Sequence, residues 1–396
     1  MVDLYHRLLK KTAHFQVEHP YITLLILFLF TVSIYGGVSK VRTVASLEQM
    51  MPKDIDEIKA FNVLRDNYMG QDMIAVILEI DRESSLENGI VDIRDYKVYN
   101  YVKELKSVLS SEPDVITAYA YSDIIDMFSK NNINQDSYAG LLTNSKVKEQ
   151  LSNFINNDYT ISVLIITTDI SADDTRMNLL SSKLKEHINS MGHPPGIKIT
   201  LTGTPVIQQK LGELISFDRS YTQKISTLFV FLVTMLTFGT FTSALVPIIV
   251  VTLSVNWLYG TMGYTNLPIS TLAGGVAAMV IGIGIDFAIH IMNKFKLERK
   301  KGIPLKKAVE LTVVETGTAL TATSMTTMAA FLAFLVGRMP EMGRFGMLMA
   351  IGIAYSLFFS LFGLPAMLVI EEKIIKKLSK KMRFGVESEY RLEEKR

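Results

Sequence analysis

The chain has 396 residues, of which 48% are hydrophobic and 20% are charged. This composition is too apolar for a typical soluble protein and suits a membrane protein that carries one sizeable polar domain. The formal net charge of +2 is nearly balanced, so only the placement of charge is informative. The absence of cysteine excludes disulfides, thiolate metal sites and catalytic thiols.

Six apolar segments are long enough to cross a bilayer, which takes about 20 helical residues. They lie at residues 21–38, 225–241, 245–262, 270–291, 318–336 and 345–370. The sequence therefore predicts an α-helical membrane protein with six transmembrane helices and an extracytoplasmic α+β domain between helices 1 and 2. We expect an N-terminal segment at 1–20, the domain at 39–221, helices 2 to 6 within 222–371 and a C-terminal tail at 372–396.

The polar domain alternates between strand and helix patterns. Strands are expected at 73–80, 114–121, 160–170 and 197–204, and helices at 96–109, 174–191 and 206–217. Two strand–helix–strand units predict a ferredoxin-like sheet of the split βαβ type. Residues 122–156 are rich in Asn, Ser and Asp, which indicates a helical insertion exposed to solvent.

The distribution of Lys and Arg predicts the orientation. Basic residues cluster at 7–11, 294–307 and 373–383, so these segments and both termini are expected in the cytoplasm of a protein of the cell membrane. The domain is then outside. Arg338 and Arg344 depart from the rule because they fall on the outer side. We expect the first span to be retained as an anchor, because its apolar run exceeds that of a signal peptide.

The fourth span carries a carboxylate, Asp286, within Gly-Ile-Gly-Ile-Asp at 282–286. An Asp near the middle of a membrane helix costs roughly 2.5–3.5 kcal/mol, so it is expected to face protein or water and to serve a function. Small residues let a neighbouring helix come close. Such residues near Asp286 are Gly274, Ala278, Gly282 and Gly284, which predicts that the carboxylate lies in a tight helix contact.

A carboxyl group in such a place can take up a proton on one side and release it on the other. His290 lies one turn nearer the inner rim, and Thr323 and Ser324 in the fifth span fall near the depth of Asp286. Their hydroxyls can donate to a carboxylate or accept from a carboxyl group. We therefore predict a proton relay of Asp286, His290, Thr323 and Ser324.

Each member of this relay also has a structural explanation. Asp286 can reach the headgroups or form a buried pair, His290 can be an interfacial packing residue, and the hydroxyls can bond their own backbone. No P-loop, metal-ligand cluster or nucleophile elbow occurs in the sequence. We therefore expect no cofactor, no metal and no enzymatic activity.

Further motifs run the length of the chain. They are Met51-Pro52 followed by a helix that ends near Gly70, Thr202-Gly203-Thr204-Pro205 before span two, Glu315-Thr316-Gly317 opening span five and Leu364-Pro365-Ala366 closing span six. With the span order and the Gly-x-Gly-x-Asp motif, the chain resembles one half of a resistance-nodulation-division transporter of the hydrophobe exporter branch. That branch includes the mycobacterial large membrane proteins and the hopanoid exporters.

The resemblance implies proton-driven export of hydrophobic or amphiphilic molecules, with Asp286 carrying the proton. Many relatives follow this Asp with Tyr, whereas this chain has Phe287. Relatives also commonly carry two halves in one chain, which implies that this single half forms a homodimer with both Asp286 residues near the interface. The expected partners are lipid-like molecules and protons, with sodium left open, and no nucleic acid. An accessory motor for protein export and a lipid sensor that does not pump remain alternatives.

Overall fold

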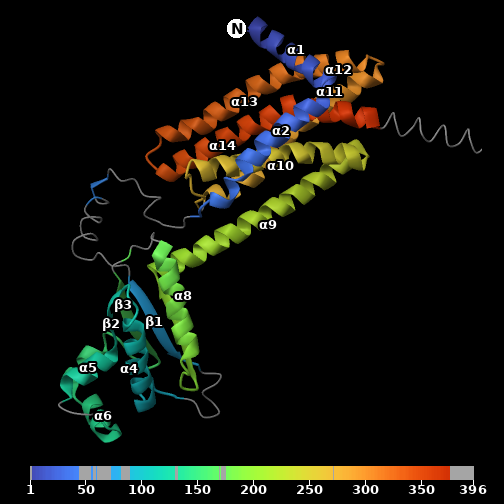
Figure 1. Cartoon of the computed structure of the whole chain (residues 1–396). Helices are drawn as coiled ribbons and strands as arrows, with labels where there is room; N and C mark the ends of the chain where they lie inside the picture. Colours follow the sequence, from blue (N-terminus) through green and yellow to red (C-terminus); the bar gives the residue numbers. More distant parts are fainter. Residues whose placement is uncertain are drawn as a thin grey trace, which may run out of the picture. The chain divides into compact units, whose positions relative to one another are not determined.

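The computed structural model describes residues 2–43, 55–56, 59, 73–81, 90–129, 133–168, 170, 175–270 and 272–374 (Figure 1). The chain forms two compact units. A membrane unit comprises Met1–Val44, Gln49–Met51 and Leu214–Arg396, and a domain unit comprises Ala45–Glu48 and Pro52–Glu213. The helix expected between Met51-Pro52 and Gly70 lies outside the described residues.

The domain unit contains a four-stranded antiparallel sheet. Its strands are β1 (Met73–Ile80), β2 (Val115–Tyr119), β3 (Ile161–Thr168) and β4 (Ile197–Gly203), in the order β2-β3-β1-β4. The central strand β1 pairs with β3 from Met73 opposite Thr167 and with β4 from Ile74 opposite Gly203. This is the strand order of a ferredoxin-like fold, so the predicted α+β fold class is confirmed.

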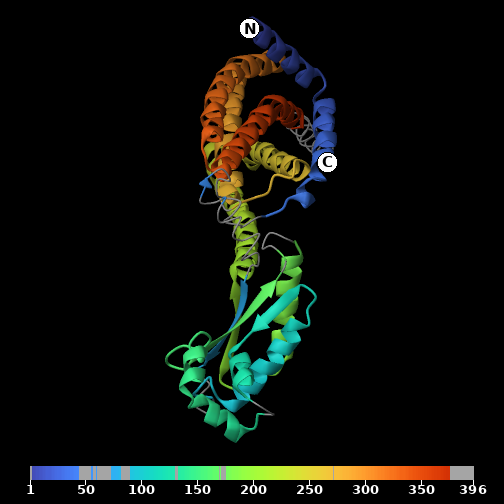
Figure 2. The ribbon, with the colours of Figure 1, turned by 90° about the vertical axis from the view of Figure 1, so that its left-hand side faces the viewer.

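One face of this sheet is buried because alternate strand residues point to the same side. In β1 these residues are Ile74, Val76, Leu78 and Ile80. Helices α4 (Tyr96–Ser110) and α8 (Thr175–Ser190) pack against each other and share this hydrophobic core (Figures 1 and 2). Asp95 caps α4 by accepting the backbone N–H of Lys97 at 2.7 Å.

Residues 122–156 contain three short helices, α5 (Tyr121–Phe128), α6 (Gln135–Leu142) and α7 (Ser145–Leu151). The Asn side chains of this segment begin two of them. Asn134 accepts the backbone N–H of Ser137 at 2.9 Å, and Asn144 accepts that of Lys146 at 3.0 Å. The composition that indicated an exposed insertion therefore reflects helix capping.

The described part of the membrane unit has six helical segments that are long and apolar enough to cross a bilayer, as predicted. They are Pro20–Lys40 with α2 (Pro20–Tyr35), Thr204–Phe238 (α9), Phe241–Tyr264 (α10), Leu272–Lys300 with α11 (Val276–Lys300), Leu305–Val336 with α12 (Leu305–Leu311) and α13 (Gly317–Leu332), and Pro340–Ile374 with α14 (Pro340–Phe358). Two π-helical turns, η3 (Thr312–Thr316) and η5 (Phe359–Gly363), interrupt the fifth and sixth segments.

These six segments differ in how far the chain itself buries them. In the most apolar window of each segment, half of the residues are buried for the third and fourth and 61% for the sixth, but only 6% for the second and 11% for the fifth. Helices α10, α11 and α14 pack on one another, and α13 lies beside α14 (Figure 1). The third, fourth and sixth segments therefore form the core of the unit.

A helix that the sequence analysis did not predict, α1 (Val2–Glu18), precedes the first span. It packs on α12 and η3, and it buries Leu9 and Ala13 on one side. The many polar residues of this segment obscure its helical pattern of buried apolar residues. The sequence analysis therefore interpreted residues 1–20 only as a cytoplasmic flank of the first span.

Three glycines let the first and third segments approach each other closely. A Cβ atom at Gly260 would collide with the carbonyl oxygen of Ile34, one at Gly37 with that of Gly260, and one at Gly263 with that of Gly37. Small residues permit such close crossings between membrane helices. Glycines thus allow a close helix contact at α10 as well as in the glycine-rich fourth span, where Gly284 meets Ser356.

We predict that Gly260→Ala destabilises the membrane unit. The added methyl meets backbone atoms, which cannot move aside as a side-chain tip can, so we expect the free energy of unfolding in detergent to fall by about 1–3 kcal/mol. Gly343→Ala is the matched control, because a Cβ there meets its nearest atom at 3.6 Å, which is an ordinary van der Waals contact. Equal melting temperatures for the two variants would contradict the close crossing.

Candidate functional site

The fourth span has one exposed face in the single chain. Its exposed residues recur every three or four positions and are Leu272, Gly275, Met279, Gly282, Asp286, His290, Asn293, Leu297 and Lys300. This spacing places them along one side of α11. The other side is buried in the bundle, including Ile285, Ala288 and Met292. We call this exposed series the open face of α11.

Asp286 lies in the middle of the open face. Among the described residues it has no hydrogen bond and no ion pair, and the next residue, Phe287, is buried in the opposite direction. The chain thus leaves a carboxylate uncovered on a helix that is apolar enough to span a membrane. A partner or water is needed at this position, because a charged side chain against hydrocarbon is costly.

His290 and Lys294 continue from Asp286 toward the end of α11. His290 is exposed and also lacks a hydrogen-bonding partner among the described side chains. Lys294 is paired with Glu298 at 3.0 Å and with Glu315 of η3 at 2.7 Å. Polar residues therefore continue along α11 from the isolated carboxylate of Asp286, past His290, to the charged network around Lys294.

The hydroxyls of the fifth span do not contact Asp286 within one chain. Thr323 is exposed and donates to the carbonyl of Leu320 at 3.0 Å, while Ser324 is buried and donates to the same carbonyl at 2.6 Å. Backbone bonding of this kind is common for Ser and Thr in membrane helices. The four-residue relay thus remains a prediction that concerns an assembly larger than the single chain.

The small residues near Asp286 point in different directions. Gly284 is buried at the contact with α14, where an added Cβ would lie 2.7 Å from the hydroxyl oxygen of Ser356. Gly274 faces Ile215 of α9, with 3.5 Å from the ideal Cβ to Ile215 Cγ2, and Ala278 is half-buried. Gly282 lies on the open face with no atom within 4 Å of its Cβ position. A packing role for Gly282 therefore requires a neighbour from outside the chain.

Comparison with known proteins gives the family. The MMPL family profile matches residues 98–386. The membrane protein MJ1562 of Methanocaldococcus jannaschii is 31% identical over 386 residues, which cover 97% of this chain and 99% of that protein. The chain belongs to the MMPL family. This membership places it in the hydrophobe exporter branch of the superfamily that the sequence resembles, which is a family of transporters.

Two further MMPL relatives have names that describe a cargo. The hopanoid transporter HpnN of Rhodopseudomonas palustris is 30% identical over 120 residues, which are 30% of this chain and 14% of that protein. The probable trehalose monomycolate exporter MmpL3 of Mycobacterium leprae is 25% identical over 280 residues, which are 69% of this chain and 29% of the relative. This chain thus matches less than a third of the length of either transporter.

The π-helical turns are features of this MMPL protein that sequence patterns did not reveal. In η5 the backbone carbonyl of Leu361 accepts the side-chain N–H of Gln16 from α1 at 2.9 Å. The hydroxyls of Ser356 and Ser360 nearby are buried and have no hydrogen-bonding partner among the described residues. Such turns often mark functional sites, because they loosen the regular backbone ladder.

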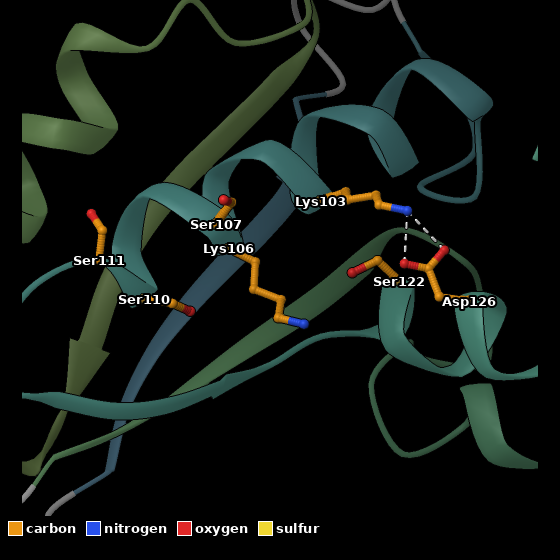
Figure 3. A pocket seen from close by; sticks show the side chains of 7 residues that line it. All are labelled: Lys103, Lys106, Ser107, Ser110, Ser111, Ser122 and Asp126. Carbon is orange, nitrogen blue, oxygen red and sulfur yellow. Dashed lines mark hydrogen bonds and ion pairs between the residues drawn. The ribbon is translucent and has the colours of Figure 1, made fainter. Parts of the chain in front are cut away.

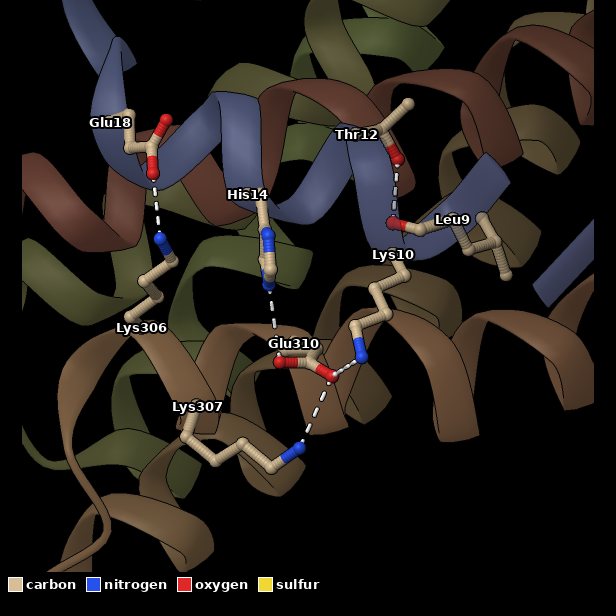
Figure 4. A network of polar contacts seen from close by, with 8 residues as sticks. All are labelled: Leu9, Lys10, Thr12, His14, Glu18, Lys306, Lys307 and Glu310. Atoms are coloured by element: carbon tan, nitrogen blue, oxygen red, sulfur yellow. Dashed lines mark hydrogen bonds and ion pairs between the residues drawn. The ribbon is translucent and has the colours of Figure 1, made fainter. Parts of the chain in front are cut away.

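A polar network holds α1 against α12 (Figure 4). Glu310 is only 13% exposed and meets the cationic groups of Lys10 at 3.0 Å and Lys307 at 3.1 Å, together with His14 at 3.2 Å. From sequence, Lys10 and Lys307 were interpreted as topology signals, and His14 was not singled out. The structure shows that they also fix the position of the first helix.

The domain unit has a surface pocket of about 380 Å³ beside α4 and α5 (Figure 3). Its lining is polar, with Lys103 paired to Asp126 at 2.8 Å and with several serines. A pocket for an apolar molecule is normally lined by hydrophobic and aromatic side chains. This pocket therefore does not match a lipid-like ligand. The described residues also contain no cluster of His, Asp or Glu that could hold a metal ion.

We predict that Glu310→Gln loosens α1. Loss of the carboxylate removes three charge-assisted contacts, whose other partners are partly exposed. We therefore expect the free energy that holds α1 in place to fall by about 1–2 kcal/mol, and amide hydrogen exchange within α1 to become roughly 5- to 30-fold faster. Glu18→Gln is the control, because the one ion pair of Glu18 among the described residues is with Lys306, and about half of each of these side chains is exposed. Equal exchange in the two variants would contradict the role of the network.

Proposed function

We propose that this MMPL protein exports hydrophobic or amphiphilic, lipid-like molecules by using the proton motive force, with Asp286 as the proton carrier. The observation that carries the proposal is the uncovered carboxylate on the open face of α11. A residue type that costs roughly 2.5–3.5 kcal/mol in the middle of a membrane helix persists where it performs work. Proton uptake and release is the chemistry that an isolated carboxyl group supplies.

A second copy of the chain covers the open face in this proposal. Two-fold symmetry is the commonest arrangement of homo-oligomers, and it makes each surface patch meet its own counterpart. Gly282 and Gly275 then let two α11 helices approach closely. The two Asp286 carboxylates then face each other across the axis.

The proton path follows the polar residues of α11. From Asp286 a proton passes by His290 toward the charged network of Lys294, Glu298 and Glu315. Both termini are cytoplasmic in this topology, which places the network at the inner membrane face. The hydroxyls of Thr323 and Ser324 join the relay if their backbone bonds open during the cycle.

The cargo class comes from the named relatives. One of them is named for hopanoids and the other for trehalose monomycolate, both of which are lipid-like. The open face and the domain of this chain would act on molecules of the same amphiphilic kind, taken from the outer leaflet and passed through the outer domain.

We predict that Asp286→Asn abolishes coupled proton flux while the protein stays folded. The wild type, reconstituted in liposomes with a pH-sensitive dye inside, should acidify or alkalise the lumen under an imposed gradient when a transported lipid is present. The asparagine variant should give the flux of empty liposomes, because a side-chain amide does not take up or release a proton at physiological pH. A sodium gradient in place of the proton gradient tests the other ion.

Asp218→Asn is the matched control, since Asp218 is an exposed carboxylate of α9 that lies outside the open face. This variant should keep the wild-type flux. Lipid-dependent flux that survives in Asp286→Asn, or a loss of flux in both variants, would contradict the assignment of Asp286.

A further inference from the structure

Four cationic residues lie at the domain-side ends of the first, fifth and sixth spans, where the positive-inside rule disfavours them. Lys40 and Arg42 follow the first span, and Arg338 and Arg344 lie where the fifth span passes into the sixth. Three of the four line one hollow of about 370 Å³. Residues from distant parts of the sequence thus bring positive charge together at a single place.

The walls of this hollow are built from fixed backbone. The carbonyl of Arg42 accepts the N–H of Ile269 at 2.8 Å, and Thr43 forms a parallel bridge with Ile269. Asn266 has a left-handed backbone with φ of 52°, which Asn tolerates better than most residues. The connection after α10 therefore holds the segment of Lys40 and Arg42 in a defined position.

The side chains of the hollow combine charge with an apolar wall. The Lys40 ammonium lies 5.1 Å from the centroid of the Tyr264 ring, while Met262, Leu267 and Pro268 form the apolar part. None of the described residues that line it is acidic. Arg344 has a further contact of its own within the chain, yet its guanidinium still adds to the positive potential.

Arg and Lys side chains bind oxyanions through charge-assisted hydrogen bonds. A soluble anion would use the cations of the hollow and leave its apolar wall uncovered. An amphiphile with an anionic headgroup uses both, since its first apolar groups can cover Met262 and Leu267. The location at the domain-side end of the spans is the level at which headgroups of that leaflet lie.

We infer that this hollow binds the anionic headgroup, a phosphate or carboxylate, of an amphiphile in the leaflet on the domain side. The inference deepens the proposed function and rests on it for one point only, namely that the bound amphiphile is cargo. It predicts that the transported amphiphile carries a negatively charged headgroup. It also gives the outer basic residues a role that topology does not explain.

The test measures binding of radiolabelled dioctanoyl phosphatidic acid to the purified full-length chain in a non-ionic detergent, without any gradient. Each basic residue near a membrane surface contributes about 1 kcal/mol, so Lys40→Gln and Arg42→Gln should each weaken binding about 5-fold and the double variant about 25-fold. Arg338→Gln is the matched control, because Arg338 is an exposed arginine on the same side that does not line the hollow. It should bind like the wild type.

Two competitors separate the possible ligands. Unlabelled dioctanoylglycerol should displace the probe poorly because it lacks the anion, and inorganic phosphate should do so poorly because it lacks the chains. Displacement by phosphate as effective as that by the unlabelled probe would overturn the inference in favour of a simple anion site. Equal weakening by Arg338→Gln would overturn it in favour of diffuse surface charge.

Binding and transport can fail separately in these experiments. Headgroup binding that depends on Arg42, in a protein without proton flux in liposomes, would support the site and contradict the proposed function. Flux that depends on Asp286, with lipid binding insensitive to Lys40 and Arg42, would support the proposed function and contradict the headgroup site.

Discussion

The cost of an ionisable group in hydrocarbon is the constraint on which the account of this protein depends. Asp286 is uncovered in the single chain, in the middle of a helix that the bundle buries on its other side. An uncovered Asp of this kind cannot face lipid without a penalty of roughly 2.5–3.5 kcal/mol. A partner or water must therefore cover this position in the membrane, and we propose that a second copy of the chain does so at the open face of α11.

The distribution of packing within the membrane unit agrees with this conclusion. The third, fourth and sixth spans form a core that includes the contact of Gly284 with Ser356, and the first span crosses the third closely at Gly260. Few residues of the second and fifth spans are buried. One π-helical turn lies in the sixth span of the core and the other in the sparsely buried fifth span, so the unit has both well-packed and adjustable helix contacts. Coupling proton binding to the movement of a cargo requires both kinds of helix contact. Proton binding acts by shifting the equilibrium between two arrangements of the helices, and adjustable contacts allow the second arrangement.

Much of the fold could be predicted from the sequence, because strand alternation and long apolar runs are local signals. The strand at Met73–Ile80 and the six spans follow directly from them. The sequence did not predict α1 as a helix. The helix expected at 206–217 was predicted to lead into the second span, and in α9 the two form one continuous helix because no residue between them breaks it. For the site, the spacing identified the stripe of Gly282, Asp286 and His290 but not its direction. The direction depends on which face the other helices bury, and that is a property of the whole bundle.

The most direct test of the central claim is cross-linking between copies at the open face of α11. The chain has no cysteine, so Met279→Cys places a single thiol two turns from Asp286 on a side chain that is 49% exposed. Leu29→Cys on α2, at 59% exposed, is the control. In native membranes, a short bifunctional thiol reagent should join Met279→Cys into covalent dimers and leave Leu29→Cys monomeric. Absence of dimers for Met279→Cys, or equal yields for both variants, would contradict the claim that a second copy covers Asp286.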